Sequence, residues 1–322
     1  MSLAETLARN LRDLTLRDLT LRAGLAKVPS YRLFDLVLKR RSPLSPSLVR
    51  FTFGGPEIAR VRTLAPDQRV KLLFPAADRS LPQLPATGDW RRQVRSLEAR
   101  RRPPMRTYTI RALRREAGEV DIDFVLHGET GPASRWAAHA RPGERLVMSA
   151  PDGEYSGDPG GYEWRPPKDI RHILLIGDET ALPAIAGILE ELADRDQRPT
   201  VQAFIEIPRE SDRLDLRCAP ETQLNWLARD VAKHEHGQEM LRAASELATL
   251  PEAGKPQRVS EVDIDRQVLW ELAKPTNGEF YAWVAGESAA VMAIRRHWIG
   301  ELGLDRRTAS FMGYWRQGKA ST

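Results

Sequence analysis

The chain has 322 residues, of which 41% are hydrophobic, and this length and composition predict roughly two globular domains with separate cores and argue against disorder. Its single cysteine, Cys218, excludes an intramolecular disulfide, a cysteine-held zinc site and an iron–sulfur cluster, and it fits a reducing cytoplasm. The net charge of +5 is modest, and no apolar run reaches the roughly 20 residues of a membrane span.

Residues 1–28 contain the tandem LRDLT-LRDLT and are predicted to form a helix from their leucine and arginine content. Their leucines scatter around the helix axis, so they form no single apolar stripe. The segment also lacks the continuous apolar core of a signal peptide. We expect an appendage without chemistry of its own, a packing or dimer element, on a cytoplasmic protein that is a monomer or a weak homodimer.

Short β-type runs separated by Pro, Gly and Asp fill residues 29–156. Several alternate with period two, as in 120–124, where apolar residues alternate with aspartates. A helix is expected near 89–100 and a helical turn near 134–140. Six strands at this spacing predict an antiparallel barrel, and one of these strands is the continuous segment 105–114.

A Gly- and Pro-rich segment, residues 157–169, interrupts this pattern and is the expected linker. From residue 170 onward, apolar strands alternate with helices, and the segment ETQLNWLARD at 221–230 is interpreted as one of these helices. Apolar runs that are buried on both faces predict an open parallel sheet with helices on each side, as in nucleotide-binding domains. The second domain is therefore expected to span 170–322.

Two strand-to-helix turns of this second domain carry polar side chains. The first holds Asp178 and Thr180, and the second holds Glu287 and Ser288, each after a glycine. Ligands of open α/β sheets bind at the carboxyl ends of strands, so we expect both turns to converge on one ligand. The structural alternative is that the glycines only permit tight turns, with Thr180 and Ser288 as helix caps. Neither Gly-x-Gly-x-x-Gly nor a P-loop motif is present.

The segment RRPPMRTYTIR combines a cation, an aromatic ring and hydroxyl groups on one predicted strand. Arg106 and Tyr108 point to one face, and Thr107 and Thr109 point to the other. A guanidinium binds phosphate in bidentate fashion and a tyrosine stacks on planar rings, so the pattern suits a ligand with both groups. The structural alternative is an exposed cross-strand pair. A nearby Gly-Pro-Ala-Ser turn, which opens a helix capped by Ser134, predicts a second phosphate cradle.

Two further features indicate no binding function. Arginine clusters at 39–41, 91–102 and 295–296 are typical of a solvated face, and no nucleic-acid-binding motif accompanies them. His234 and His236 have the spacing of metal ligands but lack a neighbouring carboxylate or thiol set, so no metal site is expected. We therefore expect neither nucleic acid nor a metal ion as partner.

Five segments together resemble the siderophore-interacting proteins, FAD-dependent ferric-siderophore reductases related to the ferredoxin-NADP reductase superfamily. In order over residues 31–319 they are RPPMRTYTIR, DFVLHGETGPASRWA, ILLIGDETALPAI, WVAGESAAVMAIRRHWIGELGLDRR and GYWRQGKA. The resemblance implies a six-stranded FAD-binding barrel, followed by an open parallel-sheet NAD(P)-binding domain. It also implies electron transfer from NAD(P)H through FAD to the Fe(III) of a siderophore.

The resemblance further implies roles for single residues. Its flavin-binding positions are Arg106, Thr107, Tyr108, Thr109, His127, Gly131, Ala133 and Ser134. Its nicotinamide-binding positions are Asp178, Thr180, Ala181 and Glu287. Among them, Arg106 is implied to bind a flavin phosphate, Tyr108 to flank the isoalloxazine ring, and Thr109 to face its reactive N5 edge. Trp315 is implied to lie near that ring and to yield to the incoming nicotinamide, which makes Thr109 and Trp315 the candidate catalytic residues.

The substrate of such an enzyme is an anionic ferric chelate, which a cationic pocket attracts. The resemblance implies that this pocket is formed by Lys71, Arg316 and Lys319. The choice of the electron donor depends on the residues after the second strand of the second domain. Glu206, at the end of that strand, is able to repel the 2'-phosphate of NADPH or to bond a ribose hydroxyl. Arg209 and Arg213 follow it within reach of a 2'-phosphate. NADPH is therefore the expected donor, and NADH is the alternative. Two other functions stay open: a general flavin reductase or electron-transfer module, and a siderophore-binding protein without turnover.

Overall fold

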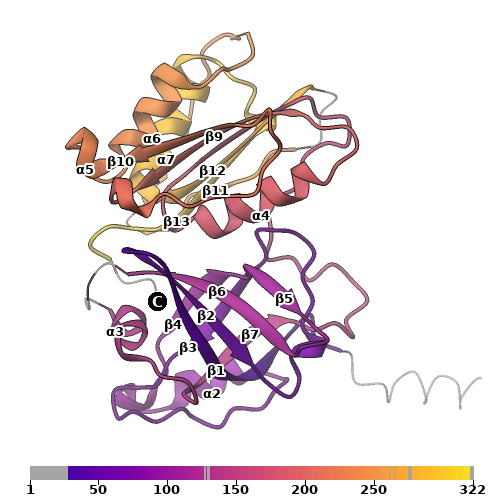
Figure 1. The fold of residues 1–322 in the computed structure, drawn as a ribbon, viewed down its shortest axis with the longest axis vertical. Coiled ribbons are helices and arrows are strands. Elements are labelled where there is room, and N and C mark those ends of the chain that lie inside the picture. Colours follow the sequence, from indigo (N-terminus) through magenta and orange to yellow (C-terminus); the bar gives the residue numbers. More distant parts are fainter. Residues whose placement is uncertain are drawn as a thin grey trace, which may run out of the picture.

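A computed structural model describes residues 28–319, apart from 127, 129, 130, 253, 261, 265 and 275–277. Its two domains lie one above the other in Figure 1. The helix expected at the N-terminus and the predicted flavin residue His127 lie outside the described residues. Within the described ranges, no helix is long and apolar enough to cross a lipid bilayer.

Seven strands build the first domain: β1 (Tyr31–Ser45), β2 (Leu48–Gly54), β3 (Arg69–Leu73), β4 (Met105–Thr109), β5 (Ala112–Arg114), β6 (Glu119–Val125) and β7 (Arg145–Pro151). They form one antiparallel sheet in the order β4-β3-β7-β1-β2-β6-β5, which curls into the barrel at the bottom of Figure 1. The barrel is confirmed, but the prediction of six strands is wrong.

The additional strand arises because the segment expected as one strand, 105–114, changes its partner. β4 pairs with β3, whereas β5 pairs with β6. At the break, the Ile110 N–H donates to the Gln68 carbonyl and the Arg111 N–H donates to the Asp121 carbonyl, both at 2.9 Å. The chain thus connects the two edges of the curled sheet. Residue alternation does not reveal such a change of partner, because it continues through the break.

Aromatic rings fill the barrel core and fix α3 (Pro132–His139) against it. The Trp136 ring lies 5.3 Å from Phe51 and 5.9 Å from Phe124, measured between centroids. The short helices η1 (Ile58–Arg60), α2 (Trp90–Ser96) and η2 (Ala99–Arg101) lie outside the sheet. The aspartates of β6 are buried with their apolar neighbours, because they form ion pairs with Arg50 and Arg114.

The second domain is an α/β fold whose strands are β8 (His172–Gly177), β9 (Thr200–Ile207), β10 (Gln223–Ala228), β11 (Trp270–Glu271), β12 (Phe280–Glu287) and β13 (Ala309–Trp315). The sheet order is β10-β9-β8-β12-β13-β11, parallel except for β11 at one edge. Its helices are η3 (Glu210–Asp212), α4 (Leu182–Ala193), α5 (Arg229–Ala232), α6 (Gln238–Arg242), η4 (Ala243–Leu247), α7 (Ser288–Arg295), η5 (Arg296–Glu301) and η6 (Arg306–Thr308). Figure 1 shows α4 on one face of the sheet and α6 and α7 on the other.

The prediction of a helix at 221–230 is wrong. Residues 223–228 form β10, which is paired in parallel with β9 over its whole length. The apolar residues of this segment fit either period, and the free edge of β9 decides for the strand. The alternation of strands and helices is otherwise observed, and it places the carboxyl ends of five parallel strands at one edge of the sheet, where ligands of such folds bind.

The segment that connects the domains, 157–169, packs firmly between them. Both the Glu163 and Trp164 N–H groups donate to Oδ2 of buried Asp67, at 2.7 and 3.0 Å. Glu163 also pairs with Arg69 of β3 at 2.6 Å, and the Trp164 ring is buried in the core of the α/β domain. Asp212 adds a further connection, because its Oδ1 accepts from Ser45 and Ser47 of the barrel at 2.7 Å.

Candidate functional site

The β3–β4 pair carries the segment Arg106–Thr109. Tyr108 packs on the core side, where its ring stacks on Phe124 with a centroid distance of 4.2 Å. Burial raises the pKa of its hydroxyl. Thr107 is exposed on the other side of the sheet and lies opposite Lys71 of β3. Tyr108 and Thr107 therefore lie on opposite faces of the strand, as predicted.

Arg106 and Thr109 stand at the two ends of this segment. Arg106 is half-buried, and its Nη1 donates to the Met105 carbonyl at 2.7 Å. Thr109 is buried at the last position of β4, opposite Arg69. Because Arg69 pairs with Glu163 of the connecting segment, this end of β4 faces the junction of the domains. A flavin edge at Thr109 would therefore be within reach of a donor bound to the second domain.

The N-terminus of α3 is the second half of the predicted flavin site. The helix begins at Pro132, with Gly131 as its N-cap residue and no side-chain cap. The prediction that Ser134 caps this helix is wrong, because proline, with its fixed φ, starts the helix two residues earlier. Ala133 and Ser134 lie buried in its first turn.

A phosphate group fits this helix end. A Cβ atom built on Gly131 would meet no atom within 4 Å, so there is room beside the backbone. The first amide groups of a helix lack intrahelical partners and attract anions. The residues present therefore fit the FAD that the resemblance implies: Tyr108 for its ring, and Arg106 and this helix end for its phosphates.

Asp178, at the end of β8, brings the predicted nicotinamide residues together. Its Oδ1 accepts from the Thr180 N–H at 2.9 Å and from the Thr180 hydroxyl at 2.5 Å. Its Oδ2 accepts from the Glu287 N–H at 2.9 Å and from Trp315 Nε1 at 2.8 Å. The Thr180 hydroxyl is thereby occupied and does not cap α4, whose N-cap residue is Ala181. The two turns therefore meet at Asp178, and their convergence on one ligand stays a prediction.

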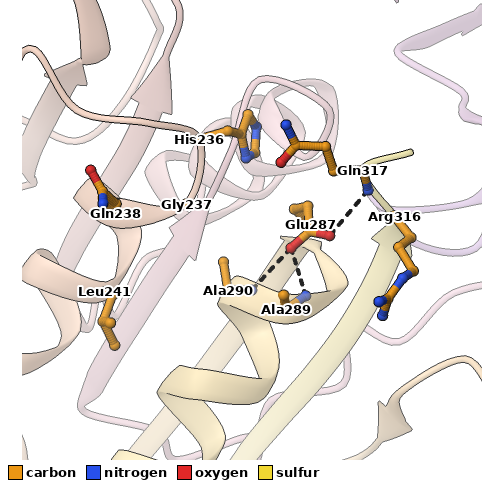
Figure 2. A pocket seen from close by; sticks show the side chains of 9 residues that line it. All are labelled: His236, Gly237, Gln238, Leu241, Glu287, Ala289, Ala290, Arg316 and Gln317. Atoms are coloured by element: carbon orange, nitrogen blue, oxygen red, sulfur yellow. Dashed lines mark hydrogen bonds between the residues drawn. The ribbon is translucent and has the colours of Figure 1, made fainter. Parts of the chain in front are cut away.

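Glu287 caps α7 at the second turn. Figure 2 shows its carboxylate accepting from the N–H groups of Ala289 and Ala290, at 2.6 and 3.1 Å. The alternative of a Ser288 cap is therefore wrong; the Ser288 hydroxyl donates to the Trp315 carbonyl at 2.8 Å instead. Glu287 thus holds the turn in place, and direct contact between this side chain and a nicotinamide stays a prediction.

Gly286 allows the close approach of the two turns. Its φ is +153°, and a Cβ atom there would lie 2.7 Å from Asp178 Oδ2. Gly177 is similarly restricted, since a Cβ atom would lie 2.7 Å from that of Ala181. The glycines therefore do permit tight turns, as the structural alternative proposes, but they also bring the polar groups of the two turns together.

A buried charge network beside Asp178 was not predicted from the sequence. Arg229 donates to both oxygens of Glu179 at 2.9 Å and to Glu206 at 3.0 Å. His236 Nε2 lies 3.5 Å from an oxygen of Asp178 and from one of Glu179. The sequence feature that could have pointed to His236 is the motif His-Glu-His, but its carboxylate partners, Asp178 and Glu179, are distant in the sequence. Glu206 is 0% exposed, so it offers no free oxygen to a ribose.

The pKa values in this network diverge. Burial and the neighbouring Glu179 carboxylate raise the pKa of Asp178 to about 6. Burial acts on Glu179 in the same direction, but the neighbouring His236 and the hydrogen bonds from Arg229 prevail and lower its pKa to about 2. Burial disfavours the charged form of His236, yet these carboxylates raise its pKa. Among the described residues, no group of His, Cys, Asp and Glu is arranged to hold a metal ion.

A pocket of about 270 Å³ opens beside this network. It lies between the N-terminal ends of α6 and α7 and the chain that follows β13, and it is lined by His236, Gly237, Gln238, Leu241, Glu287, Ala289, Ala290, Arg316 and Gln317. Figure 2 shows Glu287 between His236 and the amide groups of α7. The pocket thus adjoins the strand ends where a nicotinamide nucleotide is expected.

The three predicted substrate-binding cations lie on both domains. Lys71 is half-buried on β3, and its Nζ lies 3.3 Å from the Thr107 hydroxyl. Burial, Arg91 and Arg69 lower its pKa. Arg316 lines the pocket of the second domain, and Lys319 is bridged to it in one turn. The structure therefore brings Arg316 and Lys319 together, whereas a joint pocket with Lys71 stays a prediction.

Family models match both domains of this chain. A siderophore-interacting FAD-binding domain matches residues 37–155, and a siderophore-interacting protein domain matches residues 170–318. The chain belongs to the siderophore-interacting protein family. This confirms the resemblance drawn from the five segments, and it makes FAD the cofactor of the barrel domain.

Two relatives of this siderophore-interacting protein cover nearly its whole length. An uncharacterized protein of Mycobacterium tuberculosis, Rv2895c, is 31% identical over 294 residues, which are 89% of this chain and 90% of that protein. The ferric vibriobactin reductase ViuB of Vibrio cholerae is 28% identical over 290 residues, again 89% of this chain and 90% of the relative.

Solved structures agree with this assignment. A siderophore utilization protein from T. fusca is 29% identical and superposes with a TM-score of 0.68, over 90% of this chain and 95% of that one. The ferredoxin reductase of carbazole 1,9a-dioxygenase superposes with a TM-score of 0.54 at 16% identity, over 88% and 70% of the two chains, which shows a shared fold. The siderophore-interacting protein thus has the two-domain fold of the ferredoxin reductases.

Proposed function

We propose that this protein is an NAD(P)H-dependent ferric-siderophore reductase. Bound flavin accepts two electrons as a hydride and delivers them one at a time, a step that nicotinamide and iron do not perform directly. One NAD(P)H then yields NAD(P)⁺, a proton and two Fe(II) from two Fe(III). Ferrous iron is bound far less tightly by oxygen chelators, so the siderophore survives intact.

Each group of side chains has a defined task in this proposal. Arg106 and the N-terminus of α3 would hold the flavin phosphates, and Tyr108 would orient the ring from the barrel side. Thr109 lies at the domain junction, where a nicotinamide bound at the strand ends of the second domain would reach the flavin edge. Trp315 covers those strand ends until a nucleotide arrives. The carboxylate of Asp178 positions both turns through its four hydrogen bonds.

The observation that supports a ferric chelate as substrate is the position of Lys71. This cation lies on the strand paired with Thr107, beside Arg69 and Arg91. Arg69 is neutralised by Glu163, whereas no carboxylate among the described residues forms an ion pair with Lys71 or Arg91. A half-buried lysine surrounded by cations is costly unless it serves an anion. The ferric reductase ViuB, a relative over nine-tenths of the chain, supports the same substrate class.

One absorption experiment separates the three candidate functions. We expect yellow protein whose flavin bands bleach with anaerobic NADPH and return when a ferric catecholate or hydroxamate is added, with formation of Fe(II). A general flavin reductase would bleach equally fast but reoxidise with no preference among ferric chelates. A siderophore-binding protein without turnover would be colourless and indifferent to NADPH, and that result would overturn the proposal. The single cysteine supports a place for this reaction in the cytoplasm.

We also propose that Arg209 favours NADPH over NADH. Arg209 lies two residues after the end of β9 and is exposed, without a carboxylate ion-paired to it in the described chain, whereas Arg213 pairs with Glu210 at 2.8 Å. Arg209→Ala is therefore expected to raise KM for NADPH about tenfold and to leave KM for NADH unchanged, because a guanidinium–phosphate contact is lost. Arg213→Ala is the matched control. Steady-state kinetics with both nucleotides measure this; equal effects of the two substitutions would refute the assignment.

A further inference from the structure

His236 occupies an unusual position in the second domain. It lies in the loop between α5 and α6, with only 12% of its side chain exposed. Its Nε2 lies 3.5 Å from Asp178 Oδ2 and 3.5 Å from Glu179 Oε2. Its Nδ1 lies 3.8 Å from Glu206 Oε1. These distances are those of ion pairs and exceed ordinary hydrogen bonds, so the imidazole acts on three carboxylates at once by charge.

The same imidazole touches Trp315. The two rings are nearly perpendicular, with centroids 4.8 Å apart. Trp315 Nε1 donates to Asp178 Oδ2, the oxygen that His236 also faces. His236 thus supports both the ring of Trp315 and the carboxylate that holds it. His234, two residues away, is different: it is 41% exposed and pairs with Glu239.

We propose that His236 is a positioning residue that keeps Trp315 docked on Asp178, and that it thereby controls when the strand ends admit a nicotinamide. The inference rests on the proposed function, since it concerns access of NAD(P)H to that site. His236 acts only through Asp178 and Trp315.

The charges around His236 define the conditions under which Trp315 is held. Three carboxylates, those of Asp178, Glu179 and Glu206, face it from the ends of β8 and β9, and the Arg229 guanidinium balances one of them. Glu287 and Arg316 line the same pocket. When His236 is charged, His236 and Arg229 together provide two positive charges against the three carboxylates. Without that charge, Asp178 and Glu179 lie together with only Arg229 as a counter-charge.

The sign of the pH effect follows from these contacts. Asp178 has a pKa of about 6, so above that pH its ionised carboxylate is a strong acceptor for the Trp315 indole. His236 has a raised pKa and is protonated at pH 6. Trp315 is therefore held most firmly between pH 6 and the raised pKa of His236. The positive charge of His236 lowers the pKa of Asp178. When the imidazole is replaced, this effect is lost, and the pKa of Asp178 rises by about one unit.

Stopped-flow reduction of the bound flavin by NADH tests this pH dependence of the contact between Trp315 and Asp178. NADH is chosen because it lacks the 2'-phosphate, and phosphate monoesters titrate near pH 6 themselves. We expect the apparent Kd for NADH to fall about tenfold as the pH drops through about 6, because protonated Asp178 releases Trp315. In His236→Gln this transition moves up by about one pH unit, and in His234→Gln it stays. Identical midpoints in all three proteins would overturn the proposal.

A second readout does not depend on activity. With ¹⁵N-labelled tryptophan in the full-length protein, the Trp315 indole N–H resonance is identified by its loss in Trp315→Phe. We expect this resonance to titrate near pH 6 in the unsubstituted chain and about one unit higher in His236→Gln. If His236→Gln does not fold, the unsubstituted chain still decides: no pH dependence of this resonance between pH 5 and 9 would refute the proposal that Trp315 is held on Asp178. If neither nucleotide reduces the flavin at any pH, the proposed function fails, and the resonance still tests the inference about His236.

Discussion

Arg106→Ala is expected to lose most of its FAD on gel filtration, while its melting temperature without flavin stays unchanged. Arg106 is half-buried on β4, and a guanidinium–phosphate pair is a strong, charge-assisted contact. We expect the Kd for FAD to rise at least tenfold, on the order of 1.5–3 kcal/mol. Arg101→Ala is the matched control, because this arginine is exposed on η2 a few residues before the strand. Full flavin occupancy in Arg106→Ala would assign the arginine a purely structural role.

Substitutions of Tyr108 separate ring stacking from packing. Tyr108→Phe keeps the ring, so we expect it to retain FAD. Tyr108→Ala removes the ring and its contact with Phe124, so we expect it to lose both FAD and about 3 kcal/mol of unfolding free energy. Flavin absorbance and thermal unfolding measure the two effects independently. Loss of stability with full retention of FAD would show that the ring serves the core alone.

Lys71→Ala is expected to raise KM for an anionic ferric chelate about tenfold at low salt, with FAD content and reduction by NADPH unchanged. The Lys71 ammonium is half-buried beside Thr107 and has no carboxylate partner among the described residues. The Debye length shrinks from roughly 10 Å at 0.1 M salt to about 3 Å at 1 M, so the difference between the two proteins fades as salt rises. Lys39→Ala, at an exposed position of β1, is the control.

The pH dependence of chelate binding gives an independent check on Lys71. Burial, Arg91 and Arg69 lower the pKa of Lys71, so its charge is lost at a lower pH than that of an ordinary lysine. Affinity for the chelate should therefore fall as the pH rises through this lowered value, and Lys71→Ala should abolish that step. If Lys71→Ala only lowers the melting temperature and leaves KM and its salt dependence intact, the pocket assignment is wrong.

Local patterns predicted most of the fold, because apolar periodicity follows directly from which face of an element is buried. Two of the errors occurred where a distant partner decides. Residues 223–228 were predicted to be helical, and the free edge of β9 makes them a strand. The segment 105–114 was predicted to be one strand, and two different neighbours divide it into two. Helix capping was predicted at Ser134, but a proline moved the start of α3.

The sequence alone determined the order of the two domains, the Arg-Thr-Tyr-Thr strand, the polar strand-to-helix turns and the exclusion of a cysteine-bound cluster. Each of these depends on neighbours in the chain or on composition. Only the tertiary structure decided that Asp178 and Trp315, which are 137 positions apart, share a hydrogen bond, and that His236 faces them both. The physical reason is that parallel strands bring their carboxyl ends to one edge of the sheet, and spacing along the chain contains no information about which side chains meet there.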